Sequence, residues 1–133
     1  MSTGVDIITH LVNEGYGTLG TDIFLGFMPD QTNSIVVYES GGPSPYLDMG
    51  ESSANYLIRP SFQIMVRNSS YSTGKANCDA ILRTFMAIFN QSINGTYYQM
   101  IVSSGDINSL GKVTVTGGEA HEFSMNFRTT RNI

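Results

Sequence analysis

Few residues of this sequence have the types and spacing that a catalytic site requires. The two histidines, His10 and His121, have no accompanying set of base, nucleophile and ligand, so we expect ordinary packing or surface roles for both. Cys78 is the only cysteine, which excludes an intrachain disulfide. It falls on the apolar stripe of a predicted helix, where a buried and chemically idle thiol is expected. The sequence therefore favours a protein that is not an enzyme.

Metal and cofactor sites are not expected either. The seven acids before Arg59 are spread along the chain, without the paired spacing that a metal site would use. Asp48 and Glu51 come closest, and solvated loop acids are the simpler interpretation. Residues 15–20 match the letters of a dinucleotide-binding motif, Gly-x-Gly-x-x-Gly. They follow a predicted helix and precede a predicted strand, which reverses the order that this motif needs, so we predict no cofactor.

Charge is sparse and divided unevenly along the chain. Charged residues make up 14% of the 133 residues, and the formal net charge is −4. The part before Arg59 has a net charge of −7 and no basic residue, whereas the part from Arg59 onward has a net charge of +3. An acidic protein is a poor candidate for general nucleic-acid binding. Sparse charge is expected of a surface that neighbouring chains cover. The sequence shows no signal peptide and no membrane-spanning apolar run.

Hydrophobic periodicity predicts the elements that position these residues. Apolar residues at helical spacing predict a short helix before Gly15 and a main helix at residues 71–91, whose stripe is Cys78, Ile81, Leu82, Phe85, Met86 and Phe89. Five strands are predicted, the first two as a hairpin, at residues 22–28, 34–40, 56–67, 96–103 and 123–128. We predict one α+β domain over residues 1–133, with an antiparallel or mixed sheet of about five strands and two helices packed on one face.

Alternation along the strands assigns the arginines to one side. In the strand at 56–67 the apolar residues share one face, and Arg59 and Arg67 lie on the other. In the closing strand Phe123, Met125 and Phe127 point inward, and Arg128 points outward.

Two long connections, residues 41–55 and 105–118, show no regular period, and we expect both to be mobile in a free subunit. The second has a possible short strand at Val113 and Val115. The first contains apolar side chains that a free loop would leave in water, so we expect it to contact neighbouring chains. The expected contact residues are Pro43, Pro45, Tyr46, Leu47 and Met49.

Four segments, in this order and spacing, resemble the tail terminator and minor capsid (head–tail joining) proteins of long-tailed bacteriophages. They are residues 19–30 (Leu-Gly-Thr-Asp-Ile-Phe-Leu-Gly-Phe-Met-Pro-Asp), 36–42 (Val-Val-Tyr-Glu-Ser-Gly-Gly), 60–67 (Pro-Ser-Phe-Gln-Ile-Met-Val-Arg) and the closing strand 123–128. The resemblance implies a structural protein that forms a ring, usually six-fold, which caps the tail tube and meets the head–tail connector protein. It further implies a channel through which DNA passes without specific binding. The expected location is the tail or neck of the virion, and the host cytoplasm during assembly.

Two other functions stay open on the sequence. One is a head-completion or connector protein of the same particle, and the other is a small ligand-binding regulatory α+β domain. For a ring, we hypothesise that Arg59, Arg67 and Arg128 meet acids from the first half of a neighbouring subunit. The alternative is that the folded chain interleaves both halves, so that no charged patch survives.

Overall fold

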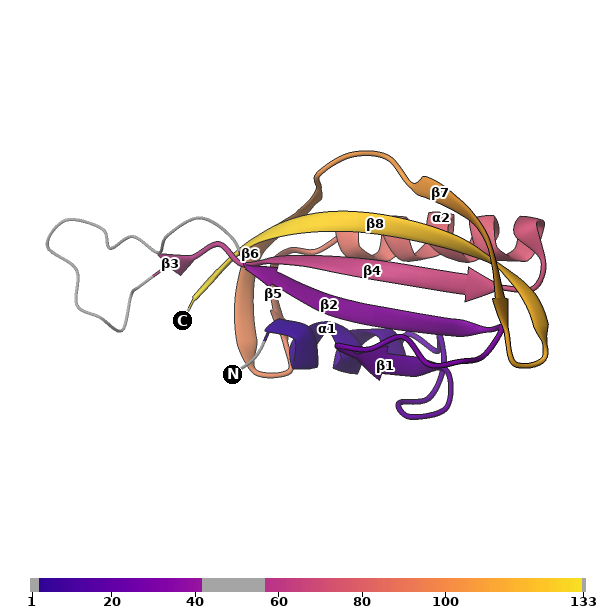
Figure 1. The fold of residues 1–133 in the computed structure, drawn as a ribbon. Coiled ribbons are helices and arrows are strands. Elements are labelled where there is room, and N and C mark those ends of the chain that lie inside the picture. Colours follow the sequence, from indigo (N-terminus) through magenta and orange to yellow (C-terminus); the bar gives the residue numbers. More distant parts are fainter. Residues whose placement is uncertain (1–2, 42–56, 133) are drawn as a thin grey trace, which may run out of the picture.

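The computed structural model describes residues 3–41 and 57–132 (Figure 1). These residues form two helices, α1 (Thr3–Asn13) and α2 (Tyr71–Met86), and eight strands of one sheet. The strands are β1 (Ile23–Leu25), β2 (Ser34–Gly41), β3 (Leu57–Ile58), β4 (Ser61–Asn68), β5 (Phe89–Ile93), β6 (Thr96–Ser103), β7 (Asn108–Val115) and β8 (Gly118–Asn132). The α+β class is confirmed, but the sheet has more strands than the five predicted.

Strand β8 is the centre of the sheet. It pairs antiparallel with β4 and β3 along one edge and with β6 and β7 along the other. The strand order is β1-β2-β4-β8-β6-β5, with β3 and β7 joined to β8 outside this order. Strand β1 runs parallel to β2, so the sheet is mixed. Figure 1 shows β8 running nearly the full length of the molecule, with β3 and β7 toward opposite ends.

Both helices pack on one face of the sheet, as predicted. Strand β4 alternates between buried and half-buried side chains, and its Phe62, Ile64 and Val66 join one core with residues of both helices. The ring of Phe85 from α2 contacts those of Phe62 and Phe127. Each large side chain buried here contributes about 1.5–3 kcal/mol to stability. We call the sheet face on the other side the outer face.

Helix α2 approaches the sheet closely at Gly74. A Cβ atom at this position would lie 2.7 Å from Cε2 of Phe123, so glycine lets the helix backbone sit against β8. The helix begins with the Ser70 side chain accepting a hydrogen bond from Thr73 N–H at 3.3 Å.

Helix α2 ends at Met86, so the prediction that it continues to residue 91 was wrong. Residues Asn94 and Gly95 both have positive φ, 51° and 84°, as a two-residue hairpin turn requires. They join β5 to β6 instead of ending a helix. Met86 and Phe89 consequently leave the predicted apolar stripe and are exposed, whereas Cys78, Ile81 and Phe85 are buried.

Three strand predictions also need correction. Strands β1 and β2 are parallel and do not form a hairpin. Because β1 has only three residues, residues 26–33 are enough to bring the chain back to the level of the start of β1. The segment 105–118, predicted as a connection with a possible short strand at Val113 and Val115, contains the eight-residue strand β7, which a bulge between Ser109 and Gly111 interrupts. Strand β8 covers 15 residues and not only residues 123–128.

Candidate assembly surface

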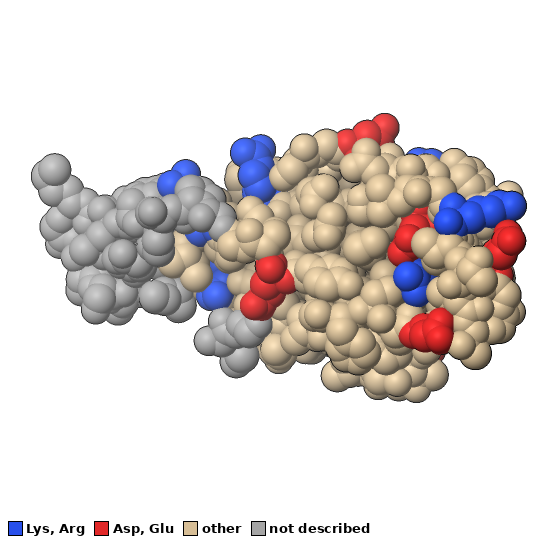
Figure 2. Space-filling model, viewed as in Figure 1, with Lys and Arg blue, Asp and Glu red and all other residues tan. Residues whose placement is uncertain are grey.

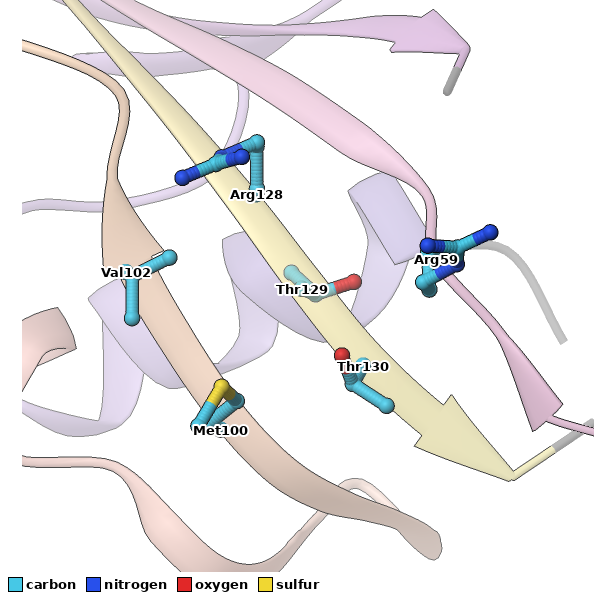
Figure 3. Close-up of a pocket in the computed structure, with 6 residues that line it drawn as sticks. All are labelled: Arg59, Met100, Val102, Arg128, Thr129 and Thr130. Carbon is cyan, nitrogen blue, oxygen red and sulfur yellow. The ribbon is translucent and has the colours of Figure 1, made fainter. Parts of the chain in front are cut away.

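A hollow on the outer face brings together two of the three arginines singled out in the sequence. It lies where β6, β8 and the break between β3 and β4 meet (Figure 3). Cross-strand pairing sets Val102 beside Arg128 and Met100 beside Thr130. Its lining residues are Arg59, Met100, Val102, Arg128, Thr129 and Thr130.

Pro60 explains why the chain breaks at the edge of this hollow. Proline has no N–H to donate to a sheet, so β3 and β4 are separate strands. Its carbonyl accepts two hydrogen bonds from Thr129, one from the backbone N–H at 3.0 Å and one from the hydroxyl at 2.8 Å. Arg59, directly before this fixed kink, is thereby held beside β8.

A bulge in β6 turns Met100 outward. The register of β6 against β8 shifts between Tyr98 and Met100, which breaks the alternation expected for this strand. Tyr98 is fully buried, and its hydroxyl donates to Asp6 at 2.7 Å, whereas Met100 is 40% exposed. Burial, together with the hydrogen bond to Asp6, raises the pKa of Tyr98, so the phenol stays a hydrogen-bond donor.

The apolar side of the hollow continues to the corner between α2 and β5. Phe89 pairs across the strands with Met100 and is 66% exposed. Met86 is also exposed, and its sulfur accepts a hydrogen bond from Ser103 N–H at 3.1 Å. Exposed Phe and Met beside Arg are characteristic of protein interfaces. This corner was not predicted from the sequence, although Asn94-Gly95 between two short apolar segments was a hairpin signal.

Arg67, the third arginine, lies toward the other end of the outer face. Its Nε donates to Glu122 at 3.0 Å, and its other guanidinium nitrogen, Nη1, donates to the Pro29 carbonyl at 2.9 Å. Next to Pro29, the Asp30 carboxylate accepts from the backbone N–H and the hydroxyl of Thr116. These contacts, which we call the latch, join residues 26–33 to the β7–β8 hairpin. The five loop residues predicted as contacts, Pro43, Pro45, Tyr46, Leu47 and Met49, lie outside the described residues.

The acidic residues in the first half of the chain, before Arg59, lie in different surroundings. Asp6 is buried, and Glu39 accepts from Gly4 N–H at the start of α1. Glu14 is 50% exposed and lies 3.8 Å from His10. Burial lowers the pKa of His10, so at neutral pH this histidine is mainly uncharged and leaves the charge of Glu14 in place. Figure 2 shows that the charged groups on this view lie mainly toward its two ends, with a largely uncharged middle.

Reactive groups are not assembled in the part of the chain described. Cys78 is fully buried, and burial raises the pKa of its thiol to about 12. Within residues 3–41 and 57–132 there is no group of three or more His, Cys, Asp or Glu that could hold a metal ion. Neither described helix has the length and apolar character needed to cross a membrane.

The fold and the hollow define an α+β protein whose exposed groups are of the kinds that bind other proteins. A family model described as bacteriophage tail terminator protein matches residues 10–133. The chain therefore belongs to the bacteriophage tail terminator protein family, which makes it a structural protein of the phage tail. A comparison with curated proteins found no match.

Proposed function

We propose that this protein forms a closed ring that caps the finished tail tube and joins it to the head connector. The observation that carries the proposal is the family match over residues 10–133. In this proposal residues 1–133 act as one domain, the role is structural, and no catalytic step is involved. The partners are further copies of the chain, the tail tube protein and the head–tail connector protein.

Two unlike surfaces support a ring. A closed ring needs a heterologous contact, in which one patch of a subunit meets a different patch of the next. The hollow with Arg59 and Arg128 is basic and apolar, and the exposed segment between α1 and β1 is acidic and apolar. In a two-fold dimer a surface pairs with a copy of itself, so basic and acidic groups would have to lie together in one patch.

The acidic net charge of −4 also agrees with this role. DNA passes through the centre of the proposed ring, and acids not used in subunit contacts would repel its phosphates and keep it from adhering. The ring would be present in the tail or neck of the virion, and in the host cytoplasm before assembly is complete.

The test combines a mass measurement with a capping assay. Native mass spectrometry of the purified protein, alone and with tail tube protein, should give one closed multiple of the 14.5 kDa subunit. Electron microscopy should then find rings at one end of each tube. Rings that bind only the connector would favour the head-completion alternative. A monomer that binds neither tube nor connector under any condition would refute the proposed function.

A further inference from the structure

We propose that the hollow lined by Arg59 and Arg128 receives the loop between α1 and β1 of a second copy of the chain. In this contact Leu19 of one copy packs against Met100 and Val102 of the next. Glu14 and Asp22, the two carboxylates between α1 and β1, face the two arginines. The inference rests on the proposed ring and names the pair of surfaces that would close it.

The donor loop is rigid and presents an apolar tip. The Thr18 carbonyl accepts hydrogen bonds from three backbone N–H groups, those of residues 21, 22 and 23, at 3.0–3.1 Å. The Tyr16 hydroxyl lies 2.8 Å from that of Thr84, which ties the base of the loop to α2. Leu19 at the tip is 57% exposed. A loop already held in one conformation loses little entropy on binding, so an exposed leucine there is suited to insertion.

The acceptor hollow is complementary to this loop in chemistry. Met100 and Val102 on β6 supply its apolar side, with Arg128 next to them on β8 and Arg59 across β8 from them (Figure 3). The Arg128 side chain is exposed, and no ion pair is found for it within residues 3–41 and 57–132. A loop that carries an exposed leucine and two carboxylates suits this chemistry, because the leucine buries apolar area against β6 while the acids approach the guanidinium groups.

The two surfaces are different patches of one chain, which makes the contact head-to-tail. Strand β1, which follows the donor loop, is one end of the strand order, whereas the hollow lies on β6 and β8 beyond β2 and β4. Figure 1 shows β3 and β6 toward the left of the view and β1 below its middle. Each copy therefore offers both halves of the contact.

The experiment is a charge exchange between two variants. Variant A carries Arg59→Glu and Arg128→Glu, and variant B carries Glu14→Lys and Asp22→Lys. When variant A or variant B is alone, groups of like charge face each other across the contact. The association constant of each variant at low salt should therefore fall about tenfold or more below wild type. When A and B are mixed, both contacts become opposite in charge, and alternating rings should form.

Matched controls separate this contact from general effects of charge and apolar area. Lys112→Glu reverses an exposed cation on β7, and Leu110→Ser removes an exposed leucine on the same strand. Both should assemble as wild type does, whereas Leu19→Ser should not. Circular dichroism melting of every variant shows whether the monomer is folded. Added salt should weaken the wild-type contact and relieve the repulsion in A and B.

The outcomes are distinct. If wild type forms rings and variants A and B form them equally well alone, the inference is wrong and the proposed function stands. If the mixture of folded A and B fails to assemble, the pairing of these two surfaces is also wrong. If wild type does not form rings even with tail tube protein, the proposed function itself fails. Loss of duplex DNA binding in A, with ring formation intact, would assign the arginines to the channel and overturn the proposal.

Discussion

The two ends of the outer face use arginine in opposite ways. At one end Arg67 is held by Glu122 and by the Pro29 carbonyl, and both side chains of the ion pair are only 14% exposed. At the other end Arg128, on the same strand as Glu122, is exposed beside apolar groups. Arg67 therefore completes its contacts within the chain. Arg128 leaves its cationic group and the neighbouring apolar area available to a partner.

This difference shows that a basic residue on a predicted outer face does not by itself mark an interface. Arg59 and Arg67 were predicted on the same face of one strand. Arg59 directly precedes the kink at Pro60 and lines the hollow, whereas Arg67 lies near the far end of β4 and is held by Glu122 and Pro29. The hydrogen bond from Arg67 to Pro29 also shows that the two charged halves of the sequence partly interleave, because it brings this guanidinium to the loop that carries Asp30. Charges of one sign remain together in the sequence between α1 and β1, at Glu14 and Asp22, and in the hollow, at Arg59 and Arg128.

The largest expected effect is on the core that supports both ends. Phe85→Ala removes a fully buried ring that contacts Phe62, Phe127 and His10, so it should lower the free energy of unfolding by about 3–5 kcal/mol. The matched control is Phe89→Ala, which should cost less than about 0.5 kcal/mol because that ring is exposed. Urea denaturation measures both. Equal losses would show that Phe89 is part of the core and not of the assembly surface.

The next effect compares the arginines directly. Arg67→Ala leaves the half-buried Glu122 carboxylate and the Pro29 carbonyl without their donor, which should cost about 1–3 kcal/mol of stability. Arg128→Ala should change stability by less than about 0.5 kcal/mol, since an exposed side chain is removed. Thermal or urea unfolding of the monomer gives both values. A larger loss for Arg128 than for Arg67 would reverse the comparison between the two ends.

Labelling of Cys78 gives a third, kinetic comparison. Because the thiol is buried and its pKa is raised to about 12, a thiol reagent should react slowly with the native protein and rapidly after unfolding. Arg67→Ala should increase the native labelling rate, whereas Arg128→Ala should leave it unchanged. Rapid labelling of the wild type would contradict the buried position of this cysteine.

The smallest expected effect is in the latch. Hydrogen bonds from the hydroxyl and the N–H of Thr116 hold the pKa of Asp30 below its ordinary value. A carboxyl whose folded pKa is depressed stabilises the fold above its unfolded pKa of about 3.9, and this contribution is lost as the pH falls through the folded value. Thr116→Val should raise the pKa of Asp30 toward its ordinary value in an NMR titration. Thr114→Val, two residues earlier and on β7, is the control and should leave that pKa unchanged.

Local patterns predicted the parts of the fold that depend on local spacing. The stripe of Cys78, Ile81 and Phe85 and the inward set Phe123, Met125 and Phe127 are buried as expected, because periods of 3.6 and 2 directly reflect one-sided burial. Only the end of strand β7, at Val113 and Val115, was predicted, because the exposed Gly, Ser, Asn and Lys residues of this strand give no alternation. It is a strand because β8 pairs with it.

The candidate surface depended on long-range register, which the sequence does not show. Arg67 and Glu122 are 55 residues apart, and only the pairing of β4 with β8 brings them together. The exposure of Met100 depends on the bulge in β6, and that of Phe89 on the early end of α2. Outward positions could be predicted for Arg59 and Arg128, but not their shared hollow.

The central position of β8 has a consequence for how the protein is made. This strand pairs with β3, β4, β6 and β7, and it supplies Phe123, Met125 and Phe127 to the core. During translation the other strands and both helices leave the ribosome first, and they cannot close that core until residues 118–132 follow. The nascent chain therefore exposes its apolar surface until then, and pairings so distant in sequence make the final closure slow. Assembly of the proposed ring would accordingly begin only after the whole sheet has been synthesised.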